Sequence, residues 1–181
     1  YDRLIEIYEA LAAHGYREVG QEYLQNVLDT AKQLDAYDSG RIYYYLGEYQ
    51  KAYLALDEAR DKGGADSYLY LGRAYAATGD YNYASSVYNN YLSKQGPNAE
   101  IYNELGLCEM AKKEYQNALA AFQAGKQIEG NSLMQTLCFN EIVAYEYLED
   151  YQQAEVLMNA YLQNYPDDQA AIREQQFLST R

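Results

Sequence analysis

A four-position pattern of aromatic and small residues recurs along the chain at nearly constant spacing. Its first occurrence is Tyr49, Ala52, Leu56 and Ala59, and each later set keeps the same internal spacing. Residues three and four apart share one face of an α-helix, so each set predicts a helix with one buried stripe. Successive sets are offset by 32, 34 and 36 residues, and a period of about 34 is typical of helix-turn-helix solenoids. The later sets are Tyr81, Ala84, Tyr88 and Tyr91; Tyr115, Ala118, Phe122 and Gly125; and Tyr151, Ala154, Met158 and Tyr161.

The residues between these sets predict a first helix in every repeat. In residues 65–98, Tyr68, Leu71 and Tyr75 fall on one helical face ahead of the signature set. The tripeptide Thr78-Gly79-Asp80 separates the two helices, and Gly96-Pro97 follows the second, as expected just past a helix C-terminus. The pattern therefore indicates consecutive helix pairs.

Two further positions repeat with the same period. An acidic residue precedes each signature tyrosine, where we expect it to cap free amides and to meet the positive end of the helix dipole. Three first helices carry a central glycine, which costs about 1 kcal/mol relative to alanine and predicts close helix packing in compensation. The acidic residues are Glu48, Asp80, Glu114 and Asp150, and the glycines are Gly40, Gly72 and Gly106.

One repeat carries a family pattern almost completely. Residues 65–98 contain Tyr68, Leu71-Gly72, Tyr75, Gly79, Tyr81, Ala84, Tyr88 and Pro97. This run resembles the tetratricopeptide repeat, whose pattern is an aromatic residue, Leu-Gly, Tyr, Gly-x-Tyr, Ala, an aromatic residue, Ala and Pro. The unit at 99–134 departs from the pattern at Glu109 and Gly125, and the unit at 135–168 has Glu141-Ile142 in place of Leu-Gly.

The resemblance implies an all-α fold, a right-handed superhelix of antiparallel helix pairs. We expect one array over residues 1–181. It comprises a degenerate repeat at 1–32, repeats at 33–64, 65–98, 99–134 and 135–168, and a cap helix at 169–181.

Composition narrows the range of partners. A net charge of −13 repels the phosphate backbone, so we do not expect nucleic acid to bind. No apolar run approaches the roughly 18 residues that a membrane span requires. Cys108 and Cys138 form no C-x-x-C pair and have no histidine nearby in the sequence, so we expect free, buried thiols and no metal site. The chain starts at Tyr1 rather than Met, which suggests a piece of a longer protein.

Catalysis is not expected. The single histidine, His14, lies in the turn of the degenerate repeat with no nucleophile or acid placed beside it, so a solvated turn residue is the simpler interpretation. The chain has no Gly-rich phosphate loop and no nucleophile elbow. We therefore predict no catalytic residues, no cofactor and no enzymatic activity.

In the fold that the resemblance implies, the first helices line a concave groove. Their sides opposite the core carry aromatic, aliphatic and amide residues, with arginines at two equivalent positions. We expect Arg41 and Arg73 to anchor a carboxylate, the alternative being that each pairs with an acidic neighbour such as Asp38 or Asp66. The full candidate set is Tyr37, Arg41, Tyr44, Tyr45, Leu69, Tyr70, Arg73, Asn103, Leu107, Phe139, Asn140 and Tyr147.

Three functions agree with this groove. The leading one is a scaffold that binds a peptide or protein segment, because exposed aromatic clusters usually mark interaction surfaces. The second is a structural module for interdomain docking or self-association, and the third is small-ligand or glycan binding by aromatic stacking. Some family members clamp a chaperone C-terminus with lysine and asparagine, but Tyr37 and Arg41 occupy those positions here, so that clamp is not expected.

Overall fold

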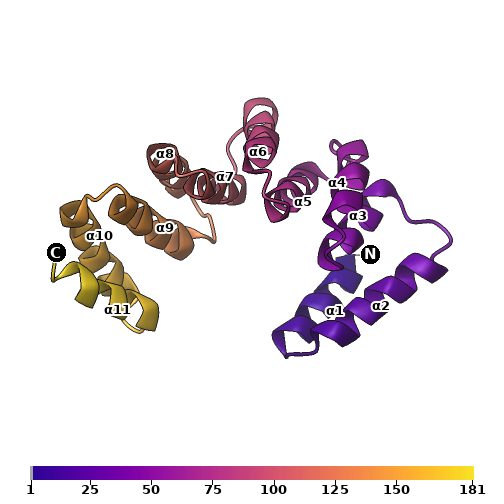
Figure 1. Cartoon of the computed structure of the whole chain (residues 1–181), viewed down its shortest axis with the longest axis horizontal. Helices are drawn as coiled ribbons and strands as arrows, with labels where there is room; N and C mark the ends of the chain where they lie inside the picture. Colours follow the sequence, from indigo (N-terminus) through magenta and orange to yellow (C-terminus); the bar gives the residue numbers. More distant parts are fainter. Residues whose placement is uncertain (1) are drawn as a thin grey trace. The chain divides into compact units, whose positions relative to one another are not determined.

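The computed structural model describes residues 2–181, and the regular elements of this part of the chain are all α-helices, without a strand (Figure 1). Eleven α-helices are present in the described range, joined by short turns. The predicted all-α class is therefore confirmed. The chain divides into two compact units, with the division between Val87 and Tyr88 inside helix α6.

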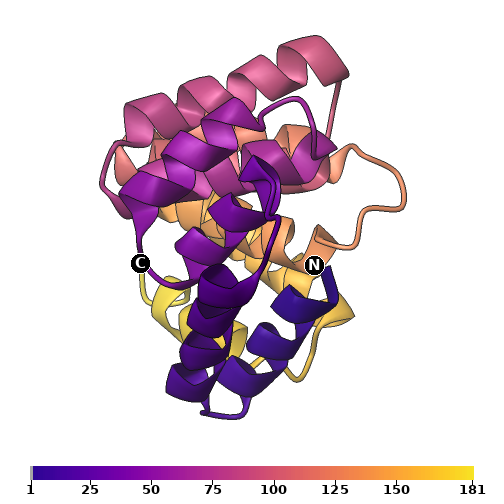
Figure 2. The same cartoon turned by 90° about the vertical axis from the view of Figure 1, so that its right-hand side faces the viewer.

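The N-terminal unit contains five complete helices and the start of a sixth. Helix α1 packs on α2, α3 on α4, and α4 on α5, and α3 also contacts α5. Both views show α1 and α2 as a hairpin near the N-terminus (Figures 1 and 2). A core cluster around Leu24 and Ile42 joins the first two pairs. The helices are α1 (Asp2–Ala13), α2 (Arg17–Thr30), α3 (Ala36–Tyr45), α4 (Tyr49–Glu58), α5 (Gly64–Ala77) and α6 (Tyr81–Gln95).

The C-terminal unit continues the same alternation. Neighbouring helices are in contact from α7 to α11. Phe122 and Leu137 centre one core cluster, and Ile142 and Met158 centre a second one that also includes Leu178 of α11. The helices are α7 (Ala99–Ala111), α8 (Tyr115–Lys126), α9 (Met134–Tyr147), α10 (Tyr151–Asn164) and α11 (Gln169–Leu178).

The turn inside every helix pair has one repeated geometry. The residue two positions before the second helix has a positive φ, and the next amide bonds back to the carbonyl five residues earlier, as from Asp80 N to Tyr75 O at 3.1 Å. In the first hairpin Tyr16 N donates to Leu11 O at 2.8 Å, so this hairpin has the same turn as the four that follow it. The positive-φ residues are Gly15, Gly47, Gly79, Lys113 and Glu149.

The predicted close approach of helices is confirmed at Gly40 and Gly106. All four signature alanines are fully buried, and a Cβ added to Gly40 would lie 2.5 Å from Leu56 Cγ. A Cβ on Gly106 would come closer than 3.0 Å to the Phe122 ring. In both cases the glycine faces the third member of the signature set, so the missing side chain makes room for a large apolar one.

The predicted acidic caps are only half correct. Asp80 Oδ1 accepts from Tyr83 N at 3.1 Å, and Asp150 Oδ1 accepts from Gln153 N at 3.1 Å. Glu48 and Glu114 make no side-chain cap bond, and Glu48 pairs instead with Lys51. A glutamate carries its carboxylate one bond further from the backbone, so it is poorly placed to bend back onto the first turn.

Candidate functional site

Three of the predicted groove tyrosines form one aromatic cluster in the N-terminal unit. Tyr44 and Tyr45 end helix α3, and Tyr70 lies at the middle of α5. Their ring centroids are 5.3 Å apart for Tyr44–Tyr45, 5.5 Å for Tyr44–Tyr70 and 5.8 Å for Tyr45–Tyr70, all near edge-to-face. Aromatic pairs favour this arrangement, so two first helices present a single ring surface.

A hydrogen-bond chain orders this cluster. The Tyr45 hydroxyl donates to Glu9 Oε1 at 2.5 Å and lies 2.9 Å from the Tyr70 hydroxyl. An ionised carboxylate only accepts, so the Tyr45 proton points to Glu9 and Tyr70 donates to Tyr45. Burial raises the pKa of Tyr45 far above its ordinary value, and the bond to Glu9 adds to the shift, so this hydroxyl remains a donor.

A cavity of about 310 Å³ opens beside the cluster. It combines tyrosine rings with one carboxylate, from Glu9, and one guanidinium, from Arg17. Helical spacing did not point to α1 and α2, because the first repeat lacks most of the family pattern. The contribution of the first helix appears in three dimensions, where Glu9 reaches Tyr45 and the Tyr8 ring lies 4.8 Å from that of Tyr45. The lining residues are Tyr8, Glu9, Ala12, Arg17, Tyr44, Tyr45 and Tyr49.

The two predicted arginines behave differently. Arg41 is 5% exposed, donates from a terminal guanidinium nitrogen to Asp38 Oδ1 at 2.6 Å, and stacks 4.3 Å from the centroid of the Tyr37 ring. Arg41 thus pairs with an acidic neighbour, which is the alternative to the predicted anchoring of a carboxylate. Arg73 is half-buried. Burial raises the pKa of Tyr70, whereas the positive charges of Arg41 and Arg73 act to lower it, so both guanidiniums lie near this phenol.

One predicted groove residue of this unit is a core residue. Leu69 is 2% exposed and therefore offers no surface to a partner. Its neighbours Tyr68 and Leu71 are also buried, so the buried stripe of α5 is wider than the pattern indicated.

In the C-terminal unit the predicted residues lie on α7 and α9. Asn140 Nδ2 donates to Asn103 Oδ1 at 2.9 Å, which links two first helices through their amides. The Phe139 ring packs edge-on against Tyr161 at 5.8 Å. Leu107 is 43% exposed and Tyr147 57%, so these two side chains present the apolar surface of the set.

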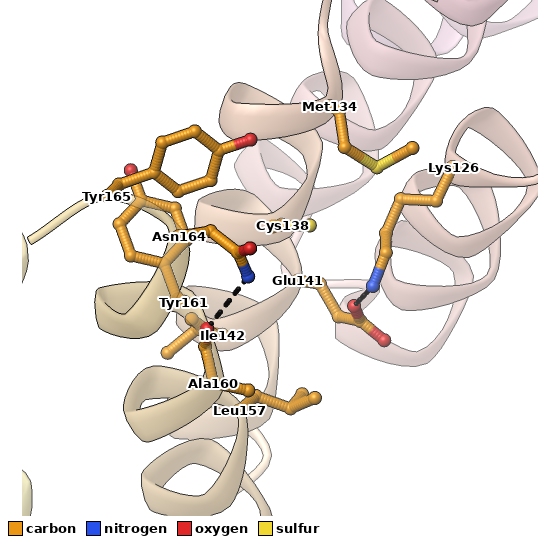
Figure 3. Close-up of a pocket in the computed structure, with 10 residues that line it drawn as sticks. All are labelled: Lys126, Met134, Cys138, Glu141, Ile142, Leu157, Ala160, Tyr161, Asn164 and Tyr165. Atoms are coloured by element: carbon orange, nitrogen blue, oxygen red, sulfur yellow. Dashed lines mark hydrogen bonds and ion pairs between the residues drawn. The ribbon is translucent and has the colours of Figure 1, made fainter. Parts of the chain in front are cut away.

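A cavity of about 330 Å³ lies between α8, α9 and α10 (Figure 3). Figure 3 shows Lys126 and Glu141 meeting at one edge, with the rings of Tyr161 and Tyr165 at the other. Glu141 also accepts from Gln123 Nε2 at 2.9 Å. The carboxylate is therefore satisfied inside the protein, and the sequence pattern had not singled out this pocket.

The remaining residues with reactive side chains are His14 and the two cysteines. His14 is exposed, with Nδ1 2.8 Å from the carbonyl oxygen of Ala10. Both cysteines are free, as predicted, but only Cys108 is buried, and Cys138 is half-exposed at the pocket edge. Within residues 2–181 no group of three or more His, Cys, Asp or Glu side chains could hold a metal. None of the helices in that range is long and apolar enough to cross a membrane.

The paired helices, the repeated turn and the glycine contacts define a helical-repeat protein of the interaction-scaffold class. A family model described as tetratricopeptide repeat matches residues 37–84 and 71–131, just over half of the chain. The chain belongs to the tetratricopeptide-repeat family. Members of this family bind protein partners and are generally non-catalytic. A comparison with curated proteins finds no match.

Solved structures share the fold. A tetratricopeptide-repeat protein from Parabacteroides merdae superposes with a TM-score of 0.69 and 18% identity, over 98% of this chain and 72% of that one. MamA from AMB-1 gives 0.64 and 23%, over 79% and 78%. Cut9 in the Cut9–Hcn1 hetero-tetramer of APC/C gives 0.65 and 19%, over 98% and 39%. At these identities the likeness is one of fold.

Proposed function

We propose that the chain is a non-catalytic scaffold that binds a peptide or protein segment against the first helices of its N-terminal unit. Tyr44, Tyr45 and Tyr70 form the ring surface, and the cavity beside them receives a side chain of the partner. Arg73 adds a positive charge near Tyr70. Arg41 has a structural role here, because Asp38 and Tyr37 already engage it.

One observation carries the proposal, namely the continuous tyrosine surface on two adjacent first helices. Tyrosine provides a large contact area at a low cost in side-chain entropy, and it is enriched among residues that dominate binding energy. The chain from Tyr70 through Tyr45 to Glu9 holds the rings in place before a partner arrives. Such preorganisation lowers the cost of binding.

The test begins with a partner captured by the intact chain and then measured by calorimetry. Tyr70→Ala removes the ring at the centre of the surface. We expect it to weaken binding by about tenfold or more, the scale of a central aromatic contact. Leu54→Ala is the matched control, because Leu54 lies on the second helix α4 of the same unit and is 69% exposed. It is expected to change affinity by less than about twofold.

Circular dichroism and a thermal melt establish that both variants are folded. A folded Tyr70→Ala variant that binds as the parent does would contradict the proposal. A partner that is lost only with Leu54→Ala would place binding on the second helices. Concentration-dependent dimerisation that Tyr70→Ala abolishes would favour the self-association module, and a glycan that competes with the partner would favour stacking of a small ligand.

A further inference from the structure

A further cavity lies in the C-terminal unit, beside the end of α9, the start of α10 and helix α11. A cavity of about 410 Å³ opens here, lined by three carboxylates and three aromatic rings. Two of these rings stand out into solvent, with Tyr147 57% and Phe177 39% exposed. The lining residues are Glu146, Tyr147, Glu149, Tyr151, Glu174 and Phe177.

The ends of the helices at this cavity carry no compensating positive charge. The last turns of α9 and α11 contain no basic residue, although the C-terminal end of a helix favours a cation. Glu146 Oε1 is buried, and the side chain that interacts with this carboxyl group is another acid, Glu174. A second carboxyl group can donate one proton at most and none when both groups are ionised, so the cavity is suited to a ligand that brings donors and positive charge.

The surroundings of Glu146 raise the pKa of this carboxyl group. Burial raises the pKa of Glu146 to about 7, and the neighbouring Glu174 carboxylate of α11 adds to this shift. Glu149, in the turn between α9 and α10, contributes a third negative charge to the lining. Arg173 of α11 is exposed and is not part of the lining, so it does not neutralise the pocket.

Two of the lining rings, those of Tyr151 and Phe177, already contact a guanidinium group of the chain itself. The Arg181 guanidinium carbon lies 4.4 Å from the centroid of the Phe177 ring and 5.6 Å from that of Tyr151. Both distances fall within the range of cation–π attraction. Arg181 is not among the residues that line the cavity, so space remains beside the carboxylates for a further cation.

We propose that this cavity binds an arginine or lysine side chain of a basic segment in a protein partner. The ammonium or guanidinium group meets Glu146 and Glu174, and its stem lies along Tyr147 and Phe177. A partner of this charge complements a chain of net charge −13. A metal ion is a poorer occupant, because no carboxylate cluster in residues 2–181 has a metal-binding arrangement. The inference is independent of the tyrosine surface in the N-terminal unit, and either can fail alone.

The probe is the peptide acetyl-Ala-Arg-Ala-amide, titrated into the intact labelled chain and followed by amide chemical shifts. Its matched control replaces arginine by citrulline, which keeps the shape of the side chain and removes the charge. We expect saturable shifts centred on Tyr147, Tyr151 and Phe177 for the arginine peptide, and affinity weaker by about tenfold for citrulline. Equal binding of the two peptides, or shifts centred elsewhere, overturns the proposal.

The variant Glu146→Gln/Glu174→Gln is expected to weaken arginine binding by about tenfold. It should remain folded, because it removes repulsion between two carboxyl groups. The control Glu114→Gln/Glu129→Gln changes net charge by the same amount at exposed positions of the same unit, and we expect less than about a twofold effect. An equal loss in both variants would mean long-range attraction rather than a site, and would overturn the proposal.

Two more measurements bear on the cavity itself. Because a bound cation favours ionised Glu146, affinity is expected to rise severalfold between about pH 6 and about pH 8, and this rise is expected to vanish in Glu146→Gln. Arg181→Ala removes a neighbouring positive charge and is expected to bind the probe at least as tightly. Loss of binding in Arg181→Ala, or an affinity that falls with pH in the parent, contradicts the proposal.

Discussion

The ring of Phe122 lies directly against the bare α-carbon of Gly106, with no room for a side chain between helices α7 and α8. The same relationship joins Gly40 to Leu56 in the N-terminal unit. In both repeats the glycine lies 16 positions before its partner in the sequence. The helix pair is thus built around one missing methyl group and one large apolar side chain.

Gly106→Ala is therefore expected to destabilise the protein. Overpacking costs about 1–3 kcal/mol, against a gain of about 1 kcal/mol in helix propensity, so a net loss of up to about 2 kcal/mol is expected in urea unfolding. Gly125→Ala is the milder comparison, because its added Cβ would lie 3.0 Å from Leu137 Cδ2 and 3.3 Å from Tyr102 Cβ, a smaller overlap than at Gly106, and a smaller loss is expected. Equal stability of the two variants would contradict the packing argument.

The turn before α8 stores strain that a glycine would release. Lys113 has a φ of 65°, in the left-handed region where an L side chain costs about 1–2 kcal/mol. Lys113→Gly is expected to raise the unfolding free energy by up to about 1 kcal/mol, the remainder being offset by the greater freedom of glycine in the unfolded chain. Lys94→Gly, within helix α6, is expected to destabilise instead, and a gain in both variants would exclude the turn as the cause.

The ion pair beside the α8–α9–α10 pocket is expected to contribute to stability. Glu141 is 5% exposed and is held by Lys126 and Gln123. Lys126→Met would leave the Glu141 carboxylate with the hydrogen bond from Gln123. We expect the free energy of unfolding, measured by chemical denaturation, to fall by about 1.5–3 kcal/mol. Lys51→Met breaks the exposed pair with Glu48 and should cost no more than about 1 kcal/mol. If the two variants lose similar amounts of stability, burial of the Glu141 carboxylate does not make its ion pair the stronger one.

Stability should decrease as the pH rises through neutrality. The pKa of Glu146 is about 7 in the folded chain against an ordinary value of 4.5, so the folded state retains a proton that the unfolded state has released. The associated stability is complete below about pH 4.5 and is lost as the pH rises to about 7. Glu146→Gln should therefore flatten the pH dependence of urea unfolding and stabilise the protein near pH 8.

Glu114→Gln serves as the reference, because it removes one exposed charge of the same unit and should leave the slope unchanged. Glu174→Gln should act in the same direction as Glu146→Gln, since it removes the neighbouring carboxylate. If neither variant alters the pH dependence between about pH 5 and about pH 8, the two carboxyl groups do not interact as described.

The repeat period was sufficient to predict the helix pairs, their turns and their tightest contacts. Helical geometry places residues three and four apart on one face, so Ala52, Ala84, Ala118 and Ala154 could be assigned to the core, and all four are fully buried. The central glycines followed from the same reasoning, because an unfavourable residue in a helix needs a packing reason. These are local properties of the chain.

The tertiary structure decided which of the candidate groove residues reach the surface. Spacing gives the direction of a side chain from its own helix but not what a neighbouring helix covers, and Leu69 is therefore buried although its position suggested a groove. The tertiary structure also decided which polar groups the long side chains contact. Arg41 turns to Asp38, Glu9 crosses from the degenerate first hairpin to Tyr45, and Glu146 meets Glu174 of α11. Long polar side chains have several rotamers of similar energy, so only the packed helices around them select one.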